Sequence, residues 1–269
     1  AVLAWCDPAR LREAAPRAVV KQSSSIRGGS DMLPRAFAAR LGDRIHYGAP
    51  VVKIEHDAAG VRVICSQEGG RQTFAADYLI CAIPFAVLRN VEVSPSFSPE
   101  KRQAVAQLGN TSVVRVFMQT RKRFWLDEGL SGAATTDMPI MTAYDKAHYL
   151  PGKRGLLEAY VAGERARSLA AMTSGVRLNF TVGQMEKILP AIREHYEGGA
   201  SVCWDEDEWA RGAYAWFKPG QMESLLPHIA RPEGRVHFAG DHTSPWPGWM
   251  RSGRSFEVRV ERESPMASR

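Results

Sequence analysis

The chain has 269 residues, 45% of them hydrophobic, which is enough to bury a substantial core in one large domain or two interleaved ones. Its formal net charge is +6, but the Lys and Arg residues are scattered and no nucleic-acid-reading motif accompanies them, so nucleic-acid binding is not expected. Widely spaced cysteines and histidines predict no metal site, and the absence of a long apolar run predicts no membrane partner and a cytoplasmic setting.

The chain begins with Ala1, and its first twenty residues read as an ordinary helical stretch, which predicts a fragment or a processed piece. A Gly-Gly turn at residues 28–29 then precedes apolar residues at helical spacing. We expect a helix with Ser30 or Asp31 as its N-cap. Its predicted apolar face carries Met32, Leu33, Phe37 and Leu41.

A run of strands is predicted next. Residues 51–54 and 61–64 flank the turn residues 57–60 as in a hairpin, and a Gly-Gly turn leads into a strand at 71–74. Residues 78–83 are continuously apolar and stop at Pro84, which is typical of a strand covered on both faces. Strands of this kind belong to layered α/β cores.

The middle of the chain alternates helices and strands. Ser98 at a cap position and Pro99 at the first helical position predict a helix that Gly109 closes. Alternating residues predict a long strand at 111–120, ended by Phe124-Trp125. Further strands are expected at 138–144 and 156–161, and helices at 165–172 and 178–189, so the sheet here is antiparallel or mixed.

Near the carboxyl end, a short buried strand at 235–239 reaches Gly240 and Asp241, and a Pro/Gly-broken turn then delivers Trp249 and Met250 to a predicted helix. This is the layout of a ligand site at the carboxyl end of a strand. The fold class expected is α/β (α+β), with two interleaved domains. One expected domain spans residues 27–104 and 205–262, and the other spans 105–204, with 1–26 as a preceding helical piece.

Five segments, in order along the chain, resemble the FAD-dependent amine oxidase family, which includes monoamine oxidases and L-amino-acid oxidases. They are RGGSDMLPRAF at 27–37, VVKI at 51–54, CAIPF at 81–85, SVVRV through FW at 112–125, and GAYAWFKPG at 212–220 together with FAGDHTSPWPGWM at 238–250. The resemblance implies that an amine or L-amino acid is oxidised at its C–N bond to an imine, with O2 reduced to H2O2. It also implies FAD as the cofactor, with residues 27–104 and 205–262 forming a partial FAD-binding Rossmann-like domain that is interleaved with a mixed-sheet substrate domain at 105–204.

The resemblance assigns cofactor roles to particular positions. The backbone of Val51 is expected at the adenine, and Pro84 and Gly240 in turns beside the flavin. Asp241, where the family usually has Glu, is expected at the ribityl or pyrophosphate region, with a helix or turn cap as its alternative. The backbone nitrogens of Trp249 and Met250 are expected at the flavin ring.

Substrate roles follow in the same way. Trp249 is expected as one wall of an aromatic cage, and the opposite wall comes from Ala213 or Tyr214; ordinary core packing is the alternative for these aromatic rings. Gly212 stands where monoamine oxidases have the Cys that bonds to flavin, so the FAD is expected to be non-covalent. Arg115 stands where the family usually has a Lys that holds a water, which leaves it as a catalytic group, a structural group or a contact to a substrate carboxylate.

Two further departures bear on activity. The family's amino-terminal G-x-G-x-x-G segment does not occur in this chain, and residues 251–257 are bulky where the family has small residues. The sequence therefore supports two hypotheses: a fragment that needs its amino-terminal half, either as a separate FAD-binding polypeptide or as missing sequence, and a non-catalytic remnant or binding subunit.

Overall fold

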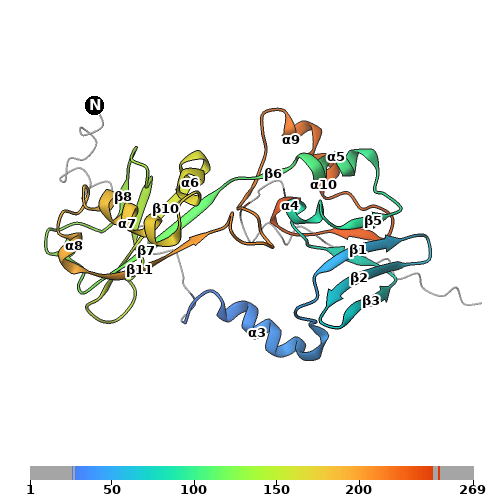
Figure 1. Cartoon of the computed structure of the whole chain (residues 1–269), viewed down its shortest axis with the longest axis horizontal. Coiled ribbons are helices and arrows are strands. Elements are labelled where there is room, and N and C mark those ends of the chain that lie inside the picture. Colours follow the sequence, from blue (N-terminus) through green and yellow to red (C-terminus); the bar gives the residue numbers. More distant parts are fainter. Residues whose placement is uncertain (1–25, 27, 245–247, 249–269) are drawn as a thin grey trace, which may run out of the picture. The chain divides into compact units, whose positions relative to one another are not determined.

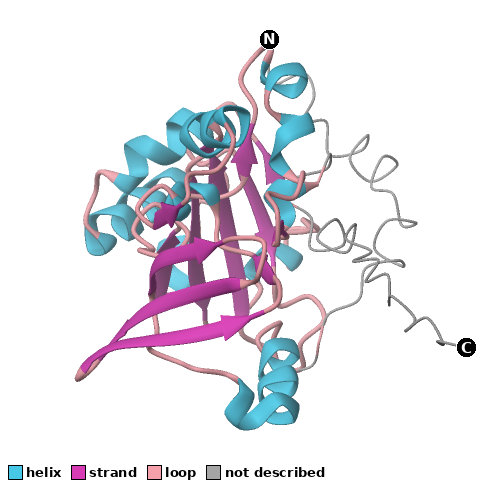
Figure 2. Cartoon of the chain, turned by 90° about the vertical axis from the view of Figure 1, so that its right-hand side faces the viewer, coloured by secondary structure: helices cyan, strands magenta, loops and turns pink. Residues whose placement is uncertain are grey.

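The computed structural model describes residues 26, 28–244 and 248, and it divides the chain into two compact units, Ala1–Ala49 and Pro50–Arg269. The described residues contain both helices and strands, in agreement with the predicted mixed class (Figure 2). The interleaved boundaries at residues 104–105 and 204–205 stay a prediction. Among the described residues, no helix is both long enough and apolar enough to cross a bilayer.

The first unit contains the predicted helix, α3 (Met32–Leu41), followed by a short 3-10 turn, η2 (Gly42–Arg44). Asp31 is the N-cap residue, but the prediction of a side-chain cap is wrong, because its carboxylate accepts a hydrogen bond from Arg35 Nε at 2.8 Å instead. No residue of α3 is buried, and Phe37 is 60% exposed. The apolar face of this helix therefore has no cover among the described residues of its own unit.

The second unit opens with a four-stranded sheet in the order β3-β2-β1-β5 (Figure 1). The predicted hairpin is confirmed: the carboxylate of Asp57 closes its turn by accepting hydrogen bonds from the backbone nitrogens of Ala59 and Gly60 at 2.7 and 3.0 Å. The edge strand β5, which pairs parallel to β1, was not predicted. The strands are β1 (Val51–His56), β2 (Val61–Gln67), β3 (Gly70–Ala76) and β5 (Glu92–Ser94).

A separate parallel pair joins β4 (Leu79–Cys81) to β13 (Val236–Phe238). Cys81 and Phe238 are buried on one face, whereas Ile80 on the other face is 55% exposed. The expectation that residues 78–83 are covered on both faces is therefore wrong for the described residues. A continuous apolar run indicates that both faces need cover, but it does not show that the same chain provides it.

Helices pack on the buried face of this pair. As predicted, Ser98 caps α5 (Pro99–Gln107), and its hydroxyl accepts a hydrogen bond from Lys101 N at 3.3 Å. The apolar side chains of this region form one core around Phe85, Leu225 and Phe238. The other helices here are α4 (Phe85–Leu88), α9 (Gln221–Ser224), α10 (Leu226–Ile229) and the 3-10 turn η4 (Asp241–Thr243).

The other large element is a five-stranded sheet in the order β11-β7-β10-β9-β8, with every neighbouring pair antiparallel. The predicted antiparallel or mixed sheet is thus antiparallel. On one face, apolar side chains such as Leu157 and Val161 pack with those of the helices into a second core. The elements are β7 (Val113–Thr120), β8 (Ala134–Thr135), β9 (Thr142–Asp145), β10 (Gly155–Ala162), β11 (Tyr196–Cys203), α6 (Gly163–Ala170), α7 (Ser174–Met185), α8 (Ile192–His195) and η3 (Phe124–Leu126).

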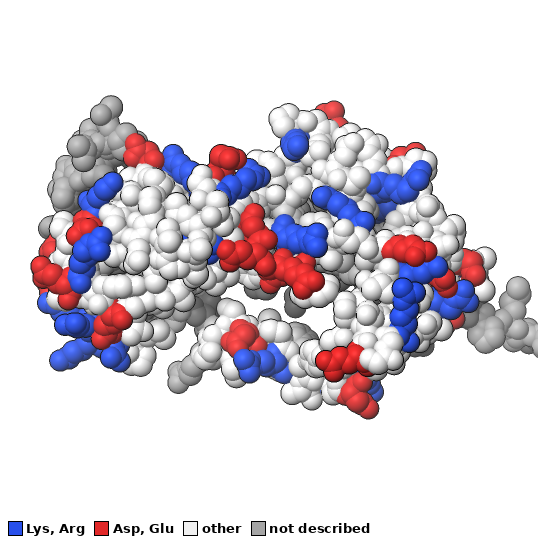
Figure 3. All heavy atoms as spheres, in the orientation of Figure 1, with Lys and Arg blue, Asp and Glu red and all other residues white. Residues whose placement is uncertain are grey.

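Between these regions, the two-residue strands β6 (Gly109–Asn110) and β12 (Ala215–Trp216) pair antiparallel. Charges of both signs are interspersed over the face that Figure 3 shows, and the described residues there form no continuous basic surface. Scattered charge of this kind matches the distribution of Lys and Arg along the sequence.

Candidate functional site

The carboxyl ends of β4 and β13 lie side by side. Cys81 is in register with Phe238, and Ala239 N donates a hydrogen bond to Cys81 O at 3.0 Å. Parallel strands end at the same edge of a sheet, so the turns that follow them, at Pro84 and Gly240, meet there. Two predicted cofactor positions are thereby brought to one edge.

Gly240 fits its position only because it has no side chain. Its φ is +115°, and a Cβ atom there would lie 2.8 and 2.9 Å from two ring atoms of His242. The next residue, Asp241, accepts a hydrogen bond from Gly248 N at 3.1 Å through Oδ2. This contact corresponds to the turn-cap alternative for Asp241. Its role toward a cofactor stays a prediction.

His242, which sequence reasoning missed, lies beneath this turn. It is 4% exposed and its ring lies 4.8 Å from that of Phe85, and no described residue hydrogen-bonds to its Nε2 atom. Desolvation by burial lowers the pKa of His242 to about 4, so the imidazole is neutral at pH 7. A buried nitrogen without a partner fits a site that is completed by a group beyond the described residues.

Tyr214 links this turn to the five-stranded sheet. A Cβ atom on Gly248 would lie 3.0 Å from Tyr214 Cγ, so the two residues are in contact. The hydroxyl of Tyr214 shares a hydrogen bond with that of Tyr160 on β10, and burial and this bond raise the pKa of Tyr160. Ala213 is held through its backbone, which donates to Thr111 O at 2.9 Å. The choice between Ala213 and Tyr214 as the second wall stays a prediction.

Arg115 lies on β7, on the face of the sheet that also carries Phe117, Tyr144, Glu158 and Tyr160; we call this the second face. The register places Arg115 opposite Tyr160. Its Nε donates to the carboxylate of Glu158, which is 1% exposed, and this bond raises the pKa of the guanidinium. Arg115 therefore has a structural partner, and its possible role in holding a water stays a prediction.

Glu158 and its second cation, Lys146, were missed by sequence reasoning. Lys146 Nζ lies 2.8 Å from Glu158 Oε2. The available signal was an acidic residue inside the apolar strand 156–161, but the partners of that acid depend on strand register, which the sequence does not reveal.

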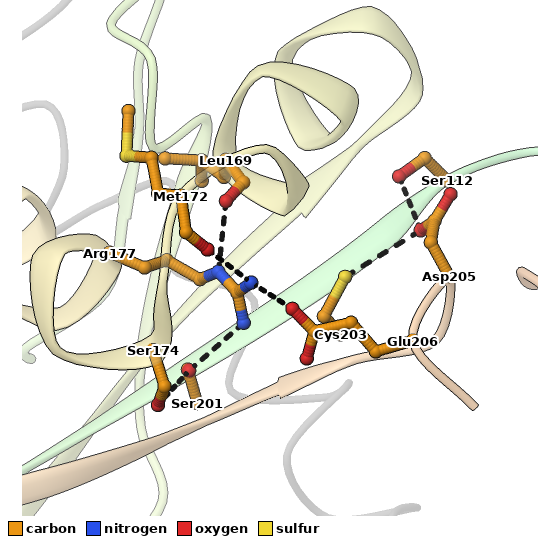
Figure 4. A network of polar contacts seen from close by, with 9 residues as sticks. All are labelled: Ser112, Leu169, Met172, Ser174, Arg177, Ser201, Cys203, Asp205 and Glu206. Carbon is orange, nitrogen blue, oxygen red and sulfur yellow. Dashed lines mark hydrogen bonds and ion pairs between the residues drawn. The ribbon is translucent and has the colours of Figure 1, made fainter.

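A buried arginine fixes the segment that leads to Tyr214 (Figure 4). Arg177 on α7 is fully buried and donates to Leu169 O and Met172 O at 2.9 Å each, and it forms an ion pair with Glu206. Next to it, Ser112 donates to Asp205 at 2.6 Å. These bonds tie the turn after β11 to α7 and β7, which sets where the chain enters residues 212–214.

The other residues that were predicted to contact the cofactor or the substrate lie in three different situations. Val51 packs against the same core as Phe238, although no described contact joins it to Gly240. Gly212 has φ +109°, and a Cβ there would lie 2.9 Å from Thr111 O, so a Cys does not fit this backbone. Trp249 and Met250, the centre of the predicted site, lie outside the described residues.

Comparisons with known proteins agree with one another. A family described as flavin containing amine oxidoreductase matches residues 9–254. YobN of Bacillus subtilis (strain 168), which carries the name of an L-amino-acid oxidase, is 32% identical over 246 residues, covering 88% of this chain and 52% of that protein. The L-amino-acid oxidase of Pseudechis australis is 26% identical over 257 residues, covering 92% of this chain and 49% of that protein.

Solved structures show the same fold. Cyclohexylamine oxidase from Brevibacterium oxydans IH-35A superposes with a TM-score of 0.76 at 23% identity, covering 84% of this chain and 50% of that one. Wild-type putrescine oxidase bound to putrescine gives 0.73 at 24% identity, covering 81% and 48%. The chain thus spans about half the length of the relatives that it matches. It belongs to the family of flavin-containing amine oxidoreductases.

Proposed function

We propose that this chain is the carboxyl-terminal portion of an FAD-dependent oxidase that converts an amine or L-amino acid to an imine, with O2 reduced to H2O2. The observation that carries the proposal is the continuous contact from Gly240 and Asp241 through Gly248 to Tyr214. It joins a strand-end turn with the geometry of a ligand site to the second face of the five-stranded sheet. A cofactor and a substrate need this adjacency to react.

The residues of the chain fit a flavin at this place. Gly240 lets the backbone approach closely, and the unpartnered Nε2 of His242 leaves a buried hydrogen-bonding position beneath the turn. When bound, the flavin supplies a two-electron acceptor that passes its electrons on to O2. Tyr214, held by Tyr160, would form one wall that orients the substrate and excludes water. Because a Cys does not fit at residue 212, we propose that the FAD is held non-covalently.

The proposal includes a second polypeptide segment that carries the first half of the fold. Two observations support it: the chain matches only about half of each relative, and the apolar faces of α3 and of the parallel pair are each uncovered by the described residues of their own unit. The segment would cover these faces and bring the pyrophosphate-binding turn that this chain lacks.

A non-catalytic remnant or binding subunit is the second candidate. The pairing of Arg115 with a buried carboxylate favours it, because an arginine so engaged differs from the amine that ordinarily holds a water at this position. The two candidates differ in one property, which is whether the assembled protein holds flavin.

The test starts from the DNA immediately upstream of the coding region. An in-frame or adjacent G-x-G-x-x-G segment is expected there, and co-expression with it should give a yellow complex that produces H2O2 from amines or L-amino acids. A colourless complex would support the remnant. The cytoplasmic location is likewise a proposal, which fractionation of the source cells would check.

A further inference from the structure

The second face of the five-stranded sheet carries a buried carboxylate held between two cations. Glu158 on β10 is 1% exposed, and it is paired with Arg115 on one neighbouring strand and with Lys146 just beyond the other. The cation side chains are 38% and 35% exposed. The carboxylate thus lies at the back of the cluster and the two cations lie at its front.

Strand register explains why these groups meet. Glu158 is paired with Phe117 on β7 and with Tyr144 on β9, whereas Ala159 points to the helix-covered face and is fully buried. Alternate residues of a strand share a face, so Arg115, Phe117, Tyr144 and Glu158 lie together. The cluster is therefore separate from the apolar core under α6 and α7.

The cluster has an excess of positive charge. Two cations face one carboxylate, which leaves a net charge of +1 at a partly exposed position. Asp145, the nearest acid along β9, is paired with Leu157 on the opposite face, where its carboxylate accepts from Ala147 N at 2.7 Å. It does not neutralise the second face.

Arg115 keeps donors for a ligand. Among the described residues its guanidinium donates only through Nε, to Glu158, so both Nη groups remain for other acceptors. A guanidinium presents its donors as a planar fork that matches a carboxylate. The rings of Phe117 and Tyr144 lie 5.5 Å from Arg115 Cζ and 5.2 Å from Lys146 Nζ, and they provide apolar surface beside the cations.

We propose that Arg115 and Lys146 bind the carboxylate of the substrate, which makes the substrate class an amino acid, and that Glu158 is the positioning residue that fixes the Arg115 fork. This rests on the proposed function, in which the second face is the substrate side. Removal of the Glu158 charge would leave two adjacent cations that repel each other, and Arg115 would lose its orientation. Glu158 itself stays behind the cations and does not touch the ligand.

The experiment measures ligand binding to the complete 269-residue chain by NMR titration, with no flavin present. Three probes separate the chemistries: L-phenylalanine, 3-phenylpropanoate, which lacks the amine, and 2-phenylethylamine, which lacks the carboxylate. Both carboxylates should bind and shift the Arg side-chain signals, whereas the amine should not. Equal binding of all three probes, or binding of none, overturns the proposal and leaves the oxidase function standing.

Variants assign the residues. Arg115→Gln and Glu158→Gln should each weaken carboxylate binding by about tenfold, because a charge-assisted bidentate contact is lost or misaligned. Arg115→Lys should retain part of the affinity, and Glu158→Asp should rescue part of the loss, which a purely structural role would not produce. Arg167→Gln, which breaks an exposed ion pair with Glu164 on α6, is the matched control and should change nothing. Unchanged affinity in folded Arg115→Lys and Arg115→Gln overturns the assignment.

Discussion

The five-stranded sheet and the parallel pair of β4 and β13 differ in how much of their packing this chain supplies. The sheet buries Trp125, Leu157 and Val161 completely in the core that it shares with α6 and α7. The pair buries Phe238 on one face, yet Ile80 on the other face is 55% exposed. Because parallel strands are ordinarily covered on both faces, the pair needs packing partners beyond the described residues.

The difference shows which parts of the fold stand by themselves. Two neighbouring pairs of the sheet, β8 with β9 and β9 with β10, follow each other in the chain and pair through short connections. The parallel strands β4 and β13 come from distant parts of the sequence and form only a two-stranded sheet. Stability should therefore be concentrated in the five-stranded sheet.

The largest test of this contrast compares Trp125→Ala with Ile80→Ala. Loss of the fully buried Trp125 should lower the free energy of unfolding by about 3–5 kcal/mol, because a large cavity forms in the core. The exposed Ile80 should cost no more than about 0.5 kcal/mol in this chain alone. Urea denaturation followed by circular dichroism measures both values. Similar losses for the two variants would contradict the contrast.

The second test removes the buried arginine of Figure 4. Arg177→Met should cost about 2–4 kcal/mol, because the carbonyls of Leu169 and Met172 lose their donors and Glu206 loses its cation. Arg167→Met breaks only an exposed pair and should stay within about 0.5 kcal/mol. If Arg177→Met unfolds at the wild-type urea concentration, the network does not hold the sheet to its helices.

A third test concerns the region beneath the parallel pair. Lys101 is fully buried, with Nζ 2.6 Å from Ile229 O and 3.7 Å from the centre of the Phe238 ring, and burial lowers its pKa to about 7. The unfolded chain then binds more protons than the folded one between about pH 7 and the ordinary lysine range. Stability should therefore rise with pH in this interval, by at most about 1.4 kcal/mol per unit.

Lys101→Met should remove this slope. We compare the unfolding free energies of wild type and variant at each pH from 7 to 8.5. This interval is chosen because thiols and phenols titrate mainly at higher pH. The difference should shift in favour of the wild type as pH rises. A difference that is constant with pH would mean that Lys101 remains charged in the folded protein.

The smallest expected effect compares two N-cap positions. Ser98→Ala should lower stability by about 1 kcal/mol, because the hydroxyl caps α5 and also donates to Glu233 at 2.8 Å. Asp31→Ala should change stability by less than about 0.5 kcal/mol, because that side chain makes no cap bond and only an exposed pair with Arg35. Thermal unfolding measures both variants, and a larger loss at Asp31 would refute the assignment of caps.

Local signals in the sequence predicted much of the fold. The Asp57 turn, the Ser98 cap and the alternation along β7 are all properties of a few neighbouring residues. The failures came from tertiary context. The carboxylate of Asp31 accepts a hydrogen bond from Arg35 instead of from the backbone of the helix. Whether the Ile80 side chain is buried depends on elements that pack on that face of the strand.

The site shows the same limit. Gly240 and Asp241 were found from their place after a strand, whereas the pairing of Glu158 with Arg115 and Lys146 depends on which strands are neighbours. The buried His242 was missed because nothing in its sequence neighbourhood distinguishes a buried imidazole from an exposed one. The roles of Trp249 and Met250 remain predictions.

The most direct test of the proposed flavin site is the amount of FAD retained by the complex of this chain with the proposed G-x-G-x-x-G segment when Gly240 is changed to Ala. Gly152→Ala is the control, because Gly152 also has positive φ, +101°, but no atom lies within 4 Å of the added methyl group. We expect a yellow wild-type complex and a yellow Gly152→Ala complex, with FAD lost from folded Gly240→Ala. Full FAD content in Gly240→Ala, or none in the wild type, would contradict it.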